Sequence, residues 1–122
     1  MMNSSILIIE DDENIRKMYT DAFVNAGFSV LTAENGEDGI EIALNKHPDI
    51  LLVDIGLPGI SGHEVVNTIR KDDWGRIAKV IFLTNFSDPE NVVHAVEEGS
   101  EEYIVKANTD IHEVVNKVRA AL

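Results

Sequence analysis

The segment Ile6-Leu7-Ile8-Ile9-Glu10-Asp11-Asp12 places four consecutive apolar residues directly before three acidic ones. Two more runs of four apolar residues follow, at Ile50–Val53 and Val80–Leu83. Unbroken runs of this length, rich in β-branched residues, are typical of strands buried on both faces, as in a parallel sheet. Two shorter or more polar segments fit edge strands. The predicted strands are Ile6–Glu10, Ser29–Ala33, Ile50–Asp54, Lys79–Thr84 and Glu102–Val105.

Helical patterns follow each of these strands. In the last pattern the apolar residues recur at helical spacing, and Thr109 and Asp110 supply a cap and a negative charge at its start. The other helices are expected over about residues 13–26, from Gly36 to Lys46, after Ser61, and after Ser87, where Glu90 completes a capping box. Five strand–helix units predict one α/β domain over residues 1–122, with helices on both faces of a parallel sheet.

Composition narrows the functional classes. The chain has 122 residues and no cysteine, which excludes disulfides, thiolate metal sites and a cysteine nucleophile. Its 10 Lys and Arg against 22 Asp and Glu give a net charge of −12, so direct binding to nucleic acid or anionic lipid is not expected. No apolar run approaches the ~18–20 residues of a membrane span, and the first residues lack the pattern of a secretory signal. The cytoplasm is the expected compartment.

Polar side chains gather where the predicted strands finish. The first strand runs into Glu10-Asp11-Asp12, the third ends in Asp54, the fourth ends in Thr84, and Lys106 follows the fifth. The strand order 2-1-3-4-5 is assumed, as the commonest at this length; in it these four strands are contiguous. Ligands of open α/β sheets bind beyond the carboxyl ends of the strands, so we expect these side chains in one site.

The acidic residues of this edge indicate a divalent cation. Several carboxylates within a few ångströms cannot all ionise without a counter-charge, and one lysine cannot balance them. Mg²⁺ accepts one or two carboxylates and keeps several waters. Asp11 and Asp54 are the best direct ligands, with Glu10 reaching the ion directly or through water. Such a site suits phosphoryl chemistry, with Asp54 as nucleophile and Lys106 and Thr84 on the phosphoryl oxygens.

At these residues the sequence resembles the receiver domain of two-component response regulators, over essentially the full chain. The resemblance implies a flavodoxin-like sheet of order 2-1-3-4-5 with five strands and five helices. The segments that carry it are Ile6–Asp12 with Ile15-Arg16, Pro48–Asp54, Leu57–Gly62, Ile81–Thr84 and Gly99–Lys106.

The resemblance implies a signalling domain, not an enzyme, that promotes its own phosphorylation and dephosphorylation. Asp54 would accept a phosphoryl group from a sensor histidine kinase or a histidine phosphotransfer protein. Glu10 and Asp11 would hold Mg²⁺, with the backbone carbonyl of Gly56 as a further ligand. Thr84 and Lys106 would contact the phosphoryl oxygens.

The resemblance also implies how the signal leaves the site. Tyr103 would be the aromatic switch that turns inward with Thr84, and the face formed by the fourth helix, fifth strand and fifth helix would change its partner affinity. The expected recipient is a downstream protein, or an output domain of the same protein if this chain is a fragment. Glu101, Glu102 and Arg119 resemble a dimer face, which supports a weak homodimer.

Three residues depart from the family pattern. Ala107 stands where proline usually follows the lysine, so a trans Lys106–Ala107 bond is predicted. Asn85 replaces a small residue, and Gly56 stands where a larger side chain is common. The departures at Ala107 and Asn85 keep open one alternative, a pseudo-receiver that retains the fold as an interaction module without regulated phosphorylation.

Two other classes fit less well. A haloacid-type phosphatase needs a second aspartate two residues after the nucleophile, and Asp54-Ile55-Gly56 lacks it. A flavodoxin needs a phosphate-binding loop after the first strand, where Glu10–Asp12 would repel phosphate.

Overall fold

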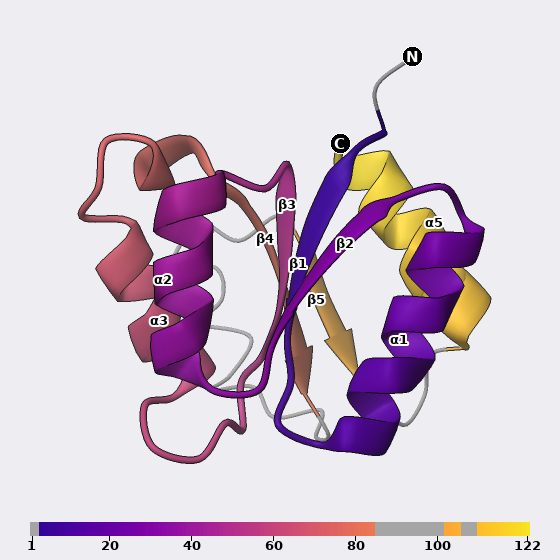
Figure 1. Cartoon of the computed structure of the whole chain (residues 1–122), viewed down its shortest axis with the longest axis horizontal. Helices are drawn as coiled ribbons and strands as arrows, with labels where there is room; N and C mark the ends of the chain where they lie inside the picture. The colour runs from indigo at the N-terminus through magenta and orange to yellow at the C-terminus, as the bar shows by residue number, and fades with distance from the viewer. Residues whose placement is uncertain (1–2, 85–101, 106–109) are drawn as a thin grey trace.

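One parallel sheet organises the protein (Figure 1). A computed structural model describes residues 3–84, 102–105 and 110–122. The strands lie in the order β2-β1-β3-β4-β5, and every neighbouring pair is parallel. Their bounds are β1 Ser5–Ile9, β2 Ser29–Ala33, β3 Ile50–Asp54, β4 Lys79–Thr84 and β5 Glu102–Val105. The predicted α/β class with a parallel sheet is confirmed.

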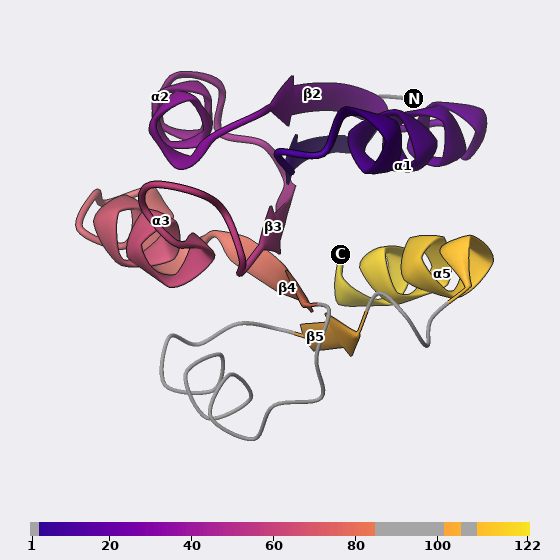
Figure 2. The same cartoon turned by 90° about the horizontal axis from the view of Figure 1, so that it is seen from below.

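Helices cover both faces of this sheet. Figure 2 shows α1 and α5 on one side and α2 and α3 on the other. The helices are α1 Glu13–Asn25, α2 Gly36–Lys46, α3 Gly62–Ile69 and α5 Ile111–Ala121, and a short 3₁₀ helix spans Gly75–Ile77. None of the helices in the described ranges is long and apolar enough to cross a membrane.

Two apolar cores result from the alternation of side chains along the central strands. Ile6 and Ile8 of β1 pack with the α1 and α5 side, whereas Leu7 and Ile9 pack with the α2 and α3 side. All four side chains are fully buried, which is why the run is apolar at every position and not at every second one. Each such side chain contributes about 1.5–3 kcal/mol to the hydrophobic stabilisation of the fold. The sheet therefore supplies a rigid frame for the residues at its edges.

The predicted boundaries differ little from the observed ones. The first strand is Ser5–Ile9 instead of Ile6–Glu10, although the Glu10 N–H still donates to the Ala33 carbonyl at 3.0 Å. The first helix ends at Asn25, and Ala26 is its C-cap. The predicted helix after Ser87 lies outside the described residues.

The 3₁₀ helix Gly75–Ile77 is not predicted from the sequence. Arg70 donates to the Gly75 carbonyl at 2.7 Å, and a Cβ at Gly75 would lie 1.7 Å from the Ile69 carbonyl oxygen. This turn is set by tertiary contacts with the end of α3, which hydrophobic periodicity does not reveal.

Candidate functional site

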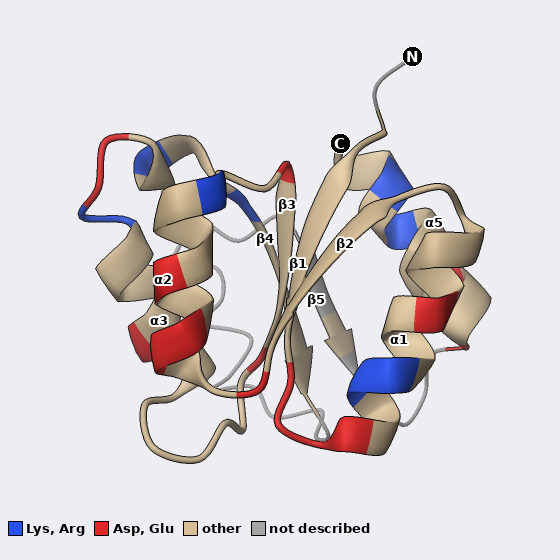
Figure 3. Ribbon diagram, viewed as in Figure 1, with Lys and Arg blue, Asp and Glu red and all other residues tan. Residues whose placement is uncertain are grey.

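The site is built where β1 and β3 finish side by side. The register pairs Ile9 of β1 with Val53 of β3, so the next residues on the two strands are Glu10 and Asp54. Both strands are parallel, and their carboxyl ends therefore share one edge of the sheet. In Figure 3 acidic residues gather at this edge, in the turns that follow the strands.

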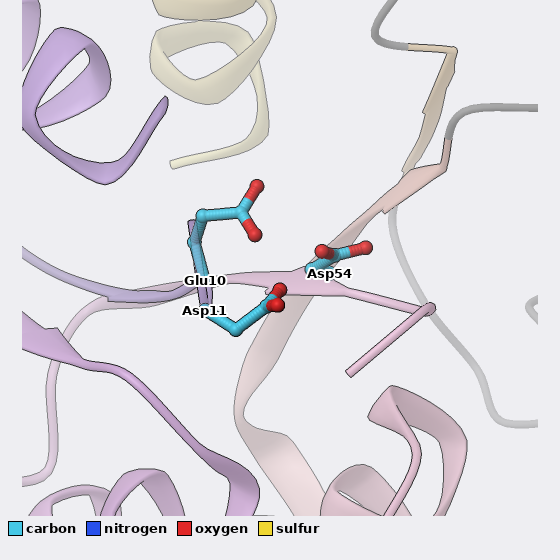
Figure 4. A group of neighbouring side chains, drawn as sticks. All are labelled: Glu10, Asp11 and Asp54. Atoms are coloured by element: carbon cyan, nitrogen blue, oxygen red, sulfur yellow. The ribbon is translucent and has the colours of Figure 1, made fainter. Parts of the chain in front are cut away.

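Three carboxylates form a cluster at this edge. One carboxylate oxygen each of Glu10, Asp11 and Asp54 lies within 4.8 Å of the others. Figure 4 shows the three side chains around a common space, two arriving from the end of β1 and one from β3. Asp11 is exposed, so the cluster is open to solvent on that side. The arrangement confirms that the sequence-predicted acidic residues lie together.

Burial singles out the same place. In the described part of the chain, the polar or charged side chains that are buried are Glu10, Asp54 and Thr84, which are 1%, 5% and 3% exposed. All three stand at or directly after the carboxyl ends of central strands. Burying a charged or polar group is costly unless it is paired or hydrogen-bonded. Because these buried polar side chains lie together at one edge of the sheet, this edge is the candidate functional site.

Short backbone contacts fix Asp54. The Gly56 N–H donates to its Oδ1 at 3.0 Å, and the Ile55 N–H donates to the Leu83 carbonyl at 2.9 Å. Gly62, the first residue of α3, packs so closely that an added Cβ would lie 2.4 Å from the Asp54 carbonyl oxygen. The turn after β3 is thus held against both β4 and α3.

Contacts with β2, with α1 and within the turn itself fix the acidic turn after β1. The Glu10 N–H bonds to Ala33 of β2, and the Asp12 N–H lies 3.4 Å from Glu10 Oε2. Asp12 caps α1, because its Oδ1 accepts from the Ile15 N–H at 3.0 Å. The guanidinium of Arg16 donates from Nη1 to the Glu10 carbonyl at 3.0 Å and lies 3.4 Å from the Asp11 carbonyl.

The remaining predicted residues are only partly described. Thr84 ends β4, and its register partner on β5 is Val105, the residue before Lys106. Lys106, Asn85 and Ala107 lie outside the described residues, as does the side chain of Tyr103, whose backbone belongs to β5. Gly56 lies exposed in the turn after β3, two residues beyond Asp54.

Arg16 is a residue of this site whose role is not predicted from the sequence. It contacts the backbone of two of the three clustered acidic residues. The signal that could have found it is its place one turn into α1, from which a long side chain reaches back over the helix start.

The fold and this edge define a doubly wound α/β domain with an acidic cluster at the carboxyl ends of its strands. The sequence model of the response regulator receiver domain matches residues 6–119. The chain therefore belongs to the response regulator receiver domain family, as the resemblance predicts.

Individual relatives agree with this assignment. The chain is 39% identical over 102 residues to the transcriptional regulatory protein AfsQ1 of Streptomyces coelicolor, an alignment that covers 84% of this chain and 44% of that protein. The crystal structure of response regulator protein TrrA from Thermotoga maritima, in complex with Mg(2+)-BeF, is 34% identical, with a TM-score of 0.86 over 98% of this chain and 99% of that one.

A more distant structure shows the fold alone. The chemotaxis protein CheY4 of Vibrio cholerae is 22% identical, with a TM-score of 0.93 over 99% of this chain and all of that one. The chain spans about half the length of the curated relatives that it matches.

Proposed function

We propose that this domain accepts a phosphoryl group on Asp54 in a Mg²⁺-dependent step and passes the signal on through a change of its surface. The observation that carries the proposal is the cluster of Glu10, Asp11 and Asp54, with oxygens within 4.8 Å of one another. Membership of the receiver family supports the same function. The proposed domain is residues 1–122, with the segment after Ser87 supplying a fourth helix.

The donor set of the cluster fits magnesium. All three side chains offer hard oxygen ligands, and the described residues bring no histidine into the group. Asp11 and Asp54 are the proposed direct ligands, Glu10 binds directly or through water, and the Gly56 carbonyl completes the protein's contribution. When bound, the ion would supply positive charge that offsets the clustered carboxylates and the phosphoryl oxygens.

The proposed reaction is an exchange of one bond to phosphorus for another. An Asp54 carboxylate oxygen attacks the phosphorus of a phosphohistidine, and the new P–O bond forms as the P–N bond breaks. The electron pair of the P–N bond returns to the imidazole nitrogen, which leaves with its partner protein. The Gly56 N–H holds Asp54 Oδ1, which fixes the carboxylate's orientation.

Thr84 and Lys106 are proposed to contact the phosphoryl oxygens. Thr84 stands one residue beyond Leu83, the register partner of Asp54, and is buried at the same edge. A hydroxyl here can donate to an added phosphoryl group, and its movement would free space for Tyr103. The face of β5, α5 and the helix proposed before β5 would then bind its partner differently.

The proposed phosphodonor is a sensor histidine kinase or a histidine phosphotransfer protein. The chain spans about half the length of its curated relatives. We therefore propose that the signal passes to an output domain of the same protein or to a separate protein.

The decisive experiment is incubation with MgCl₂ and acetyl phosphate, followed by intact mass measurement. We expect a gain of one phosphoryl group in the wild-type protein and none in Asp54→Ala. The matched control is Asp73→Ala, since Asp73 is an exposed aspartate whose contact is an ion pair with Arg76 at 3.3 Å. No gain in the wild type with this or any other phosphodonor would favour the pseudo-receiver alternative.

A further inference from the structure

Arg16 connects two segments at the sheet edge that carries the acidic cluster. It projects from the first turns of α1 and its side chain is 19% exposed. Nη1 lies 3.0 Å from the Glu10 carbonyl oxygen and 3.4 Å from that of Asp11, and Nη2 lies 4.0 Å from Glu34 Oε2 after β2. One guanidinium thus contacts the turn after β1 and the segment after β2.

The contacts of Arg16 with Glu10 and Asp11 reach the backbone of these two residues and not their carboxylates. The carbonyl oxygens of Glu10 and Asp11 accept from Arg16, which leaves both carboxylates facing the common space with Asp54 (Figure 4). A charged donor on a carbonyl makes a stronger hydrogen bond than a neutral one. Arg16 therefore fixes the peptide units that aim the two acidic side chains.

We infer that Arg16 is a positioning residue for cation binding, which it promotes by holding the Glu10–Asp11 turn. This inference rests on the proposed Mg²⁺ site. It runs against the simple effect of charge, because a positive group beside a cation site repels the cation. When the charge of Arg16 is removed, the loss of positioning predicts weaker Mg²⁺ binding and the loss of repulsion predicts tighter binding. A measurement of Mg²⁺ affinity therefore separates the two effects.

The experiment is calorimetric titration with MgCl₂ at constant ionic strength on the wild type, Arg16→Met and Arg16→Lys. We expect Arg16→Met to bind Mg²⁺ about tenfold more weakly, as is usual when a partner behind the metal ligands is lost. Arg16→Lys keeps a charged donor and is expected to recover most of the affinity. If Arg16→Met does not fold, Arg16→Gln takes its place with the same expectation.

The matched control is Arg76→Met, which also removes one positive charge. Arg76 is 70% exposed and pairs with Asp73 in the 3₁₀ region, at the far end of α3 from the cluster. Its loss is expected to leave Mg²⁺ affinity unchanged within twofold. Unchanged or tighter binding in Arg16→Met would overturn the inference.

A second measurement does not need the metal. Amide hydrogen exchange in metal-free buffer is expected to quicken at Asp11 and Asp12 in Arg16→Met and to stay unchanged in Arg76→Met. If the wild type bound no Mg²⁺, the proposed function would fail, whereas the exchange result would still report whether Arg16 holds the turn. Unaltered exchange at both residues would refute that holding role.

Discussion

Two glycines beside Asp54 differ in the room that surrounds them. A Cβ at Gly62 would lie 2.4 Å from the Asp54 carbonyl oxygen and 2.9 Å from the Ile55 Cα, and neither backbone atom can move without shifting the turn. Among the residues that the structure describes, a Cβ at Gly56 would meet only Asp54 Oδ1, at an ordinary contact distance of 3.7 Å. The close approach of α3 to the end of β3 therefore requires glycine at residue 62 but not at residue 56.

This difference predicts the stability of two alanine variants. Gly62→Ala is expected to lower the free energy of unfolding by about 1–3 kcal/mol, the usual cost of overpacking. Gly56→Ala is expected to keep it or raise it by about 0.4–1 kcal/mol, because alanine restricts the unfolded chain. Urea unfolding of both variants beside the wild type measures these changes. Equal stability of the two variants would show that the turn after β3 yields easily.

At the level of elements, Asp12 is the start signal of α1. Its Oδ1 accepts from the Ile15 N–H at 3.0 Å, which satisfies one of the free donors at the helix start. Asp12 is therefore the N-cap of α1. The acidic triplet after β1 thus divides by role, because Glu10 and Asp11 enter the cluster and Asp12 holds the helix.

Replacement of Asp12 by alanine is expected to cost about 1 kcal/mol of stability while phosphorylation by acetyl phosphate persists. Asp11→Ala is expected to behave in the opposite way, with phosphorylation lost and the helix cap intact. The measurements are thermal unfolding and intact mass on the same samples. The control is Asp110→Ala, which removes the N-cap of α5, far from the cluster. There the His112 N–H donates to Asp110 Oδ1 at 2.8 Å. Loss of phosphorylation in Asp12→Ala would place Asp12 in the site itself.

The elements that sequence predicts well are those that bury apolar runs. Ile50–Asp54 and Gly36–Lys46 are found with the predicted bounds, since a strand buried on both faces and a capped amphipathic helix leave clear patterns. No sequence pattern marks the contacts of Arg16 or the 3₁₀ helix Gly75–Ile77. Both depend on which carbonyl groups the fold brings near an arginine.

At the scale of the whole molecule, the position of the acidic cluster follows from topology. Glu10 and Asp54 are far apart in sequence and meet because parallel strands β1 and β3 are neighbours. The neighbouring strand order is a property of the family and not of hydrophobic periodicity, so the residues alone could only assume it. The same order places Thr84 beside Val105, the residue that precedes Lys106 in the sequence.

The cluster also concentrates part of the chain's net charge of −12 at one edge. In metal-free buffer its carboxylates repel one another, which opposes folding, and a bound cation reverses that effect. Replacement of one of these carboxylates should therefore raise the free energy of unfolding without the metal and lower it, relative to the wild type, with the metal. Asp11 is the suitable position, because it is exposed and its replacement leaves the core intact.

We expect Asp11→Asn to be more stable than the wild type by about 1 kcal/mol in EDTA, since one repulsive charge is removed at the solvent-exposed side. In Mg²⁺ at about 100 times its Kd the wild type gains about 2.7 kcal/mol and the variant gains little, so the order reverses. Urea unfolding at matched ionic strength with and without Mg²⁺ measures both. The control is Asp73→Asn, at an exposed ion pair, whose free energy of unfolding should change with Mg²⁺ as that of the wild type does. A variant that is less stable than the wild type in EDTA would show that Asp11 is held by favourable contacts and is not strained by its neighbours.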